Sequence, residues 1–91
     1  MAKSTHTPAY AALRAHLTRL RTAAGLSQRQ LATTLRVPHS WVAKVESGER
    51  RLDLIEFAWF CTACDASPAL EAATLLSDHA PRPRSGKGAR R

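Results

Sequence analysis

Cys61 and Cys64 form a Cys-x-x-Cys pair, a spacing that redox dithiols and zinc sites both use. A zinc site needs further ligands at usable spacing, and the nearest candidate is His79, some way along the chain. The segment around the pair has the pattern of an apolar helix, in which free cysteine behaves as a small hydrophobic residue. We therefore expect both thiols in the core, and the sequence predicts no metal site and no cofactor.

The histidines have no recognisable catalytic partners. His6, His16 and His79 stand at no familiar spacing from a serine, cysteine or carboxylate. The chain also lacks phosphate-loop, dinucleotide-binding, metalloprotease and nucleophile-elbow motifs. The sequence thus predicts a protein that is not an enzyme. A redox protein built on the cysteine pair is an alternative that would require a reactive, accessible thiol.

A third group of polar side chains lies between Pro38 and Ser47. In a helix that begins at about Pro38, Val42 and Val45 turn to one side. The opposite, solvent side then shows His39, Ser40, Ala43, Lys44 and Ser47. The lysine donates hydrogen bonds, while the histidine and the serine can donate or accept them.

Two short amphipathic segments position these side chains. In the first, Ser27 is followed by Gln30 in a capping-box pattern that starts a helix. Val37-Pro38 forces a second start, because proline disfavours helical geometry in the residue before it. Helices this short, joined by so brief a connection, should cross steeply. The segments therefore predict a helix-turn-helix.

The spacing resembles the DNA-binding helix-turn-helix of the phage-repressor (lambda-repressor-like) and Cro type, also called the xenobiotic-response-element (XRE) family. Gln28 occupies the first motif position, a glutamine in the family, and Ala32 stands where the helices cross and a small residue is required. Val42 and Val45 match the β-branched core positions. The resemblance extends from about Leu13 to Leu76.

The end of the second segment also fits, with one departure nearby. Glu46-Ser47-Gly48-Glu49-Arg50-Arg51 resembles the glutamate-x-glycine sequence with which the recognition helix of the family ends. Arg36 replaces the glycine that the family commonly has in a left-handed conformation. A non-glycine residue there costs about 1 kcal/mol, which a domain can absorb.

The resemblance implies that His39, Ser40 and Lys44 touch base edges in the major groove. Lys44 can donate to guanine O6 and N7. Ala43 and Trp41 would lie near thymine methyl groups or sugars. For Trp41, partial burial against the fourth helix or a dimer partner is an equal alternative.

Phosphate contacts should come from helix ends and from the basic loop. The N-terminus of the helix at Gln28 and Arg29 offers unpaired amides and a positive dipole end. Ser47, Arg50 and Arg51 follow the recognition helix and would reach phosphate or the minor groove. The predicted DNA-binding residues are Gln28, Arg29, Pro38, His39, Ser40, Trp41, Ala43, Lys44, Ser47, Arg50 and Arg51.

Arg21 and Glu46 match a pair that forms an internal salt bridge in the family. If this pair is partly buried, the loss of one partner leaves a stranded charge. We therefore assign Arg21 to structure rather than to DNA.

Charge is distributed unevenly along the 91 residues, whose formal net charge is +7. Residues 1–52 carry nine Lys/Arg against two acids, residues 53–79 carry five acids and no Lys/Arg, and residues 80–91 carry five Lys/Arg and no acid. A basic front and an acidic back suggest that one face meets a polyanion.

The rest of the chain predicts an all-α, five-helix domain over residues 7–79. Thr7-Pro8 starts a first helix with an apolar stripe of Tyr10, Leu13, Leu17, Leu20 and Ala24, and Gly25 ends it. Asp53 and Glu56 form a second capping box, and Leu54, Phe57, Phe60, Cys61 and Cys64 share one face of the fourth helix. Ser67-Pro68 starts a fifth helix with Leu70, Ala73, Leu75 and Leu76.

The two ends lack apolar periodicity. We expect residues 1–6 to be disordered and residues 80–91 to form a flexible basic tail, either a nonspecific DNA arm or a solubilising end. No apolar run predicts a signal peptide or a membrane span, so we expect a cytoplasmic protein without a membrane partner.

The sequence therefore predicts a regulator of transcription, a repressor, that binds double-stranded DNA. A palindromic operator read by a homodimer is expected, with helix five, parts of helix four or Trp59 in the dimer contact. The alternative is an antitoxin or interaction module whose main partner, a toxin for example, is another protein, with DNA binding as autoregulation.

Overall fold

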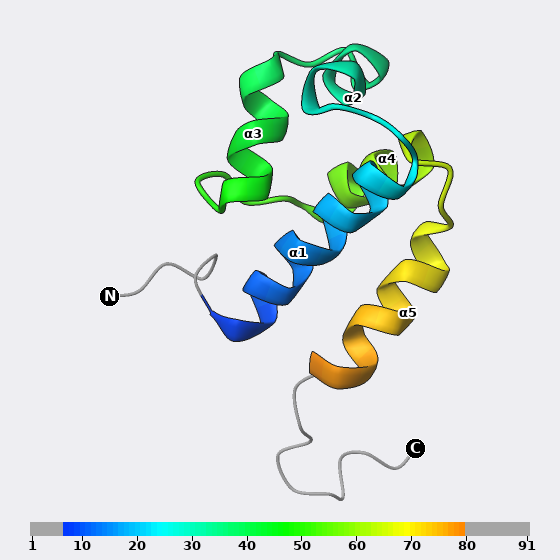
Figure 1. Ribbon diagram of the computed structural model, residues 1–91. Coiled ribbons are helices and arrows are strands. Elements are labelled where there is room, and N and C mark those ends of the chain that lie inside the picture. The colour runs from blue at the N-terminus through cyan, green and yellow to red at the C-terminus, as the bar shows by residue number, and fades with distance from the viewer. Residues whose placement is uncertain (1–6, 80–91) are drawn as a thin grey trace, which may run out of the picture.

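Five helices follow one another in the computed structural model, which describes residues 7–79. They are α1 (Pro8–Ala23), α2 (Gln28–Leu35), α3 (His39–Ser47), α4 (Leu54–Ala63) and α5 (Pro68–His79) (Figure 1). The described part of the chain contains no strand, which confirms the predicted all-α, five-helix fold. The predicted disordered start (1–6) and basic tail (80–91) lie outside the described residues.

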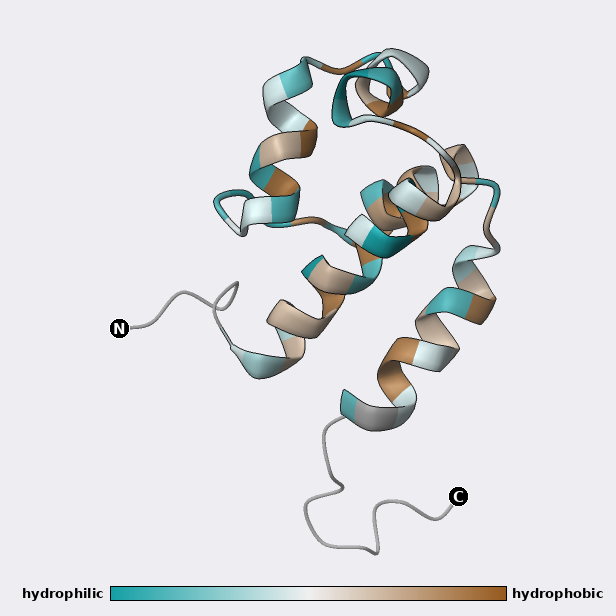
Figure 2. Ribbon diagram, in the orientation of Figure 1, coloured by the Kyte–Doolittle hydropathy of each residue, from teal (hydrophilic) through white to brown (hydrophobic). Residues whose placement is uncertain are grey.

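The two helices of the helix-turn-helix, α2 and α3, pack against different helices of the domain. α3 rests on α1, and α2 rests on α4, while α5 packs against α1 and α4 (Figure 1). Figure 2 shows that hydrophobic residues of α3 lie on its side toward α1, whereas its outer side is mostly polar. One side of α3 is therefore fixed in the core and the other is left to solvent.

The core consists of the apolar faces that the spacing predicts for the first four helices. Leu17 from α1, Leu31 from α2 and Phe60 from α4 are fully buried. The other buried core residues are Ala32, Val42, Val45, Phe57, Cys61 and Cys64. A core this small is sensitive to any change in volume, because interiors are close-packed.

Side-chain caps begin the helices where the sequence predicts them. The Ser27 hydroxyl accepts the Gln30 amide at 3.0 Å, and the Gln30 side chain accepts the Ser27 amide at 2.8 Å. The Asp53–Glu56 capping box at the start of α4 is present in the same form. The Thr7 hydroxyl accepts the Tyr10 amide at 3.1 Å. Each cap satisfies amides that a helix start leaves without a backbone partner.

Three details of the predicted helices are wrong. Leu54 is 76% exposed, because it is the first residue of α4 and extends past the helices that cover Phe57. Ala24 is exposed rather than part of the apolar stripe, because α1 ends at Ala23. The third helix begins at His39, and Pro38, with an extended ψ of 149°, is its N-cap residue.

Arg36, which departs from the family pattern, is the C-cap of α2 with φ 59° and ψ 45°. This left-handed conformation costs an L-residue about 1 kcal/mol that glycine does not incur. We expect Arg36→Gly to raise the free energy of unfolding by roughly that amount, about 1 kcal/mol, in a denaturant titration. Arg19→Gly, at an exposed position in the interior of α1, should lower it by about 1 kcal/mol. An Arg36→Gly protein less stable than the wild type would contradict this explanation.

Candidate nucleic-acid interface

The outer face of α3 carries most of the side chains that the sequence predicts to contact bases. His39, Ser40 and Lys44 are exposed on it, and Ala43 is half-buried between them. Val42 and Val45, at most 1% exposed, anchor the opposite face in the core. The helix is therefore held on one side and presents donors and acceptors on the other.

The N-terminus of α2 adjoins this face and has two predicted contact residues. Arg29 is exposed, and helix geometry leaves the amides of Gln28 and Arg29 without intrahelical partners. Gln28 is half-buried, and its side-chain amide donates to Glu46 Oε1 at 2.9 Å. Gln28 was predicted to contact DNA alone; this internal bond, which orients its side chain, was not predicted from the sequence.

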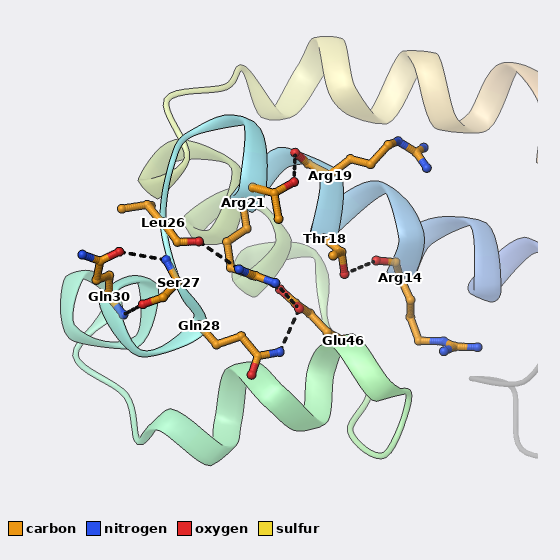
Figure 3. Close-up of polar contacts among 10 residues, drawn as sticks. Arg14, Thr18, Arg19, Arg21, Leu26, Ser27, Gln28, Gln30 and Glu46 are labelled. Carbon is orange, nitrogen blue, oxygen red and sulfur yellow. Dashed lines mark hydrogen bonds and ion pairs between the residues drawn. The ribbon is translucent and has the colours of Figure 1, made fainter.

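Glu46 is the centre of a polar cluster that joins α1, α2 and α3 (Figure 3). Arg21 Nε donates to Glu46 Oε2 at 2.7 Å, and Arg21 Nη2 donates to Oε1 at 3.0 Å. A third guanidinium nitrogen, Nη1, donates to the Leu26 carbonyl at 2.8 Å. The two charged side chains are 12% and 7% exposed, and their hydrogen bond raises the pKa of Arg21 above its ordinary value. The cluster fixes the orientation of α3 relative to α1.

The two arginines after α3 have different surroundings. Arg50 pairs with Glu56, at 3.2 Å between Nη2 and Oε2, and its guanidinium lies 5.2 Å from the centre of the Trp41 ring. Trp41 is half-buried against the core beneath it. Arg51 is exposed, and its guanidinium lies 5.8 Å from the centre of the Tyr10 ring. Much of the charge of Arg50 is thus offset within the protein, whereas that of Arg51 faces solvent.

Ser47, the last predicted contact residue of α3, is exposed where the helix ends. Its hydroxyl donates to the Lys44 carbonyl at 3.2 Å and approaches Glu49 Oε2 at the same distance. The predicted contact residues therefore lie at the start of α2, along the outer face of α3 and in the loop that follows α3.

Known proteins share this fold. Residues 12–74 match a family described as "Helix-turn-helix domain". A solved structure of an XRE-family like protein from Pseudomonas syringae pv. tomato str. DC3000 is 39% identical, with a TM-score of 0.78. The match covers 84% of this chain and 93% of that one. The chain belongs to the XRE-type helix-turn-helix family. It is a DNA-binding regulator in the general sense of that family.

No curated protein shows significant sequence similarity to this XRE-family chain. Among the helices of residues 7–79, none is both long and apolar enough to cross a membrane.

The XRE-type domain also contains a histidine–carboxylate pair that was not predicted from the sequence. His16 Nε2 on α1 lies 2.6 Å from Glu71 Oε1 on α5, and both side chains are largely buried. The two residues are 55 positions apart, a separation at which no local pattern identifies a contact. The pair connects the fifth helix to the first.

Both cysteines of the XRE-type domain are free thiols buried in the core. Burial raises the pKa of the Cys61 thiol to about 11, and burial raises that of Cys64 as well. Reactive cysteines need the opposite environment, an accessible thiol with a lowered pKa. Within residues 7–79, no group of three or more metal-ligating side chains is assembled.

We expect the native thiols to resist alkylation at pH 8 and to react only as the chain unfolds. Thiol labelling followed by mass spectrometry, with and without denaturant, measures this. Rapid labelling of the folded protein would contradict the core assignment.

The raised thiol pKa values also predict a pH dependence of stability. Above pH 9.0, the ordinary thiol pKa, the unfolded chain loses protons that the folded chain retains, so the free energy of unfolding should fall as the pH rises.

Proposed function

We propose that the chain binds double-stranded DNA in a sequence-dependent way, with α3 in the major groove, and that it represses transcription by occupying its operator in the cytoplasm. The observation that supports this most directly is the exposed face of α3, with Lys44, Ser40 and His39 presented outward from a helix anchored by buried valines. A major groove about 12 Å wide admits one such helix. Residues 7–79 form the DNA-binding domain in this proposal, and no catalytic role is included.

Base recognition in this proposal rests on three side chains. Lys44 donates to guanine O6 or N7, and the ring nitrogens of His39 and the hydroxyl of Ser40 donate or accept at neighbouring base edges. Ala43, half-buried between them, offers a methyl group to a thymine methyl. Pro38, the N-cap residue of α3, makes no side-chain capping hydrogen bond, so the first turn of α3 can approach the DNA closely.

Phosphate contacts flank the recognition helix. The free amides at the start of α2 and the exposed Arg29 bind one strand, and Ser47 and Arg51 bind beyond the other end of α3. We assign Arg50 and Trp41 to support of the loop rather than to direct contact, because Arg50 is already bonded to Glu56 and stacked on the ring. Gln28 contributes from its bonded position beside Glu46.

The test is a selection of bound duplexes from randomised DNA, followed by affinity measurements on the selected sequence and on an unrelated duplex. A short palindrome, bound at least about a thousandfold more tightly than the unrelated duplex, is expected. Equal binding to all sequences would contradict sequence readout. Failure to bind DNA at low salt would contradict the proposal as a whole.

We expect the DNA-bound form to be a homodimer, because one recognition helix buries too small an area for tight binding. The second copy would cover the apolar side chains that α4 and α5 expose, Leu54, Leu70 and Leu76 among them, each more than half exposed. Sedimentation in the presence of the selected operator measures the mass. A bound mass of one chain per complete palindrome would contradict the dimer.

A second candidate function, regulation through a protein partner, is favoured by Trp59, which is 58% exposed on α4. It borders a groove of about 460 Å³ between α2 and α4, lined by Thr34, Leu35, Ala58, Trp59, Thr62 and Ala63. Purification from the native host, with mass analysis, separates the two functions. A stoichiometric second protein that a Trp59→Ala variant loses would support this candidate, and a chain that purifies alone would contradict it.

A further inference from the structure

The first helix holds an arginine that the predicted contact set omits. Arg14 Nη1 donates to the Ser47 carbonyl at 3.5 Å, a long bond at the surface where α3 ends. Its Nε is buried and has no hydrogen-bond partner among the described residues. In Figure 3 the guanidinium projects from α1 beside the loop that follows α3. A guanidinium has five donors, so most of those of Arg14 are unused.

Gly48 lets Arg14 come this close. Its φ is +87°, and a Cβ atom there would lie 3.0 Å from Arg14 Nε. The stem of Arg14 therefore lies directly on the backbone at the C-terminal end of α3, where the helix dipole favours a positive charge. The charge is held at one edge of the outer face of α3, beside Ser47.

Arg51 is positioned by the same side of α1. Tyr10 precedes Arg14 by four residues, so the two side chains share one helix face. The Tyr10 hydroxyl accepts the Leu52 amide at 2.7 Å, and the Tyr10 ring lies under the Arg51 guanidinium. Among the side chains that the structure describes, neither Arg14 nor Arg51 has a carboxylate at ion-pair distance. Arg14 thus lies one helical turn along α1 from Tyr10, whose ring carries the Arg51 guanidinium, and neither guanidinium group is compensated.

We propose that Arg14 and Arg51 form a site that binds two neighbouring phosphates of the DNA backbone at the C-terminal end of α3, with Tyr10 as the residue that positions Arg51. The inference rests on the proposed DNA binding and adds Arg14 to it. Planar guanidinium groups match phosphate oxygens with paired hydrogen bonds, and a partner anion would complete the donors that the protein leaves free. The site carries no sequence information, because phosphates are the same in every duplex.

The test compares the salt dependence of binding for Arg14→Gln, Arg51→Gln and the double variant. Each single change should flatten the slope of log K against log salt by about 0.9 per bound chain, and the double change by about twice that. The loss should be the same on the selected operator and on an unrelated duplex. Arg19→Gln is the matched control, since Arg19 lies on α1 but borders the groove toward α5 with Thr74 and His79. It should leave the slope unchanged.

The outcomes separate this site from DNA binding itself. An unchanged slope in Arg14→Gln, with a flatter one in Arg51→Gln, would overturn the site and leave the proposed function standing. If Arg14→Gln lowered the melting temperature without changing the slope of log K against log salt, Arg14 would serve packing alone. That result would also overturn the phosphate site. If Arg14→Gln does not fold, the wild-type protein is tested instead by ethylation interference, which identifies the DNA phosphates whose ethylation prevents binding. Two neighbouring phosphates beyond the end of α3 are expected to show this interference, and a single one would overturn the site.

Discussion

Glu46→Ala should destabilise the fold by about 3 kcal/mol or more, because it leaves the guanidinium of Arg21 buried without its carboxylate. Arg21 is only 12% exposed, and Glu46 accepts hydrogen bonds from Arg21 and from Gln28. In a chain of this size, such a loss corresponds to a fall in Tm of roughly 12 °C or more. Thermal unfolding followed by circular dichroism measures it.

Arg50→Ala provides the matched control for this prediction. It also removes an ion pair, but the Arg50 side chain is 39% exposed. The expected loss is about 1 kcal/mol or less, because exposed ion pairs contribute little. Equal losses in the two variants would show that burial does not govern the strength of these pairs.

Lys44→Ala should relax the base preference at one position of each half-site. A lysine that donates to guanine contributes about 1–3 kcal/mol of discrimination, so the preference at that position should fall by roughly fivefold to 150-fold. The other positions of the selected palindrome should keep their preferences. Affinity measurements on duplexes that carry each base at the affected position give the result.

Arg29→Ala is the control for Lys44→Ala, since Arg29 is exposed at the start of α2, where phosphate contacts are proposed. Its loss should weaken binding to every sequence by a similar factor and leave the preferences intact. If Lys44→Ala behaved in the same uniform way, Lys44 would be a phosphate contact and base readout would rest on His39 and Ser40.

Local patterns predicted the parts of the fold that short-range physics decides. The capping boxes at Ser27 and Asp53 involve residues three positions apart, so the sequence displays both partners together. The faces with Leu17, Val42 and Phe60 follow from helical spacing in the same way. Spacing assigns a residue to a face but does not say how far the covering helices extend. This is why Leu54 was placed in the core wrongly.

Tertiary pairings were beyond local patterns. The bonds from Arg14 to Ser47 and from His16 to Glu71 join residues 33 and 55 positions apart. The Arg21–Glu46 pair was predicted because the family resemblance supplied it. For the candidate site, residue types and a helical face could be predicted from the sequence. The difference between Arg50 and Arg51 could not, because it depends on the positions of Glu56 and Tyr10.

Glu56 has two roles, since its carboxylate accepts the Asp53 amide at the start of α4 and also the guanidinium of Arg50. Ordering of the segment between α3 and α4 is thus coupled to formation of α4 itself. The conformational entropy of this segment is then lost during folding rather than during association with DNA. A partner that binds the segment between α3 and α4 therefore contacts a surface that is already ordered. Its residence time depends on the contacts that it makes, because no loop has to become ordered on binding.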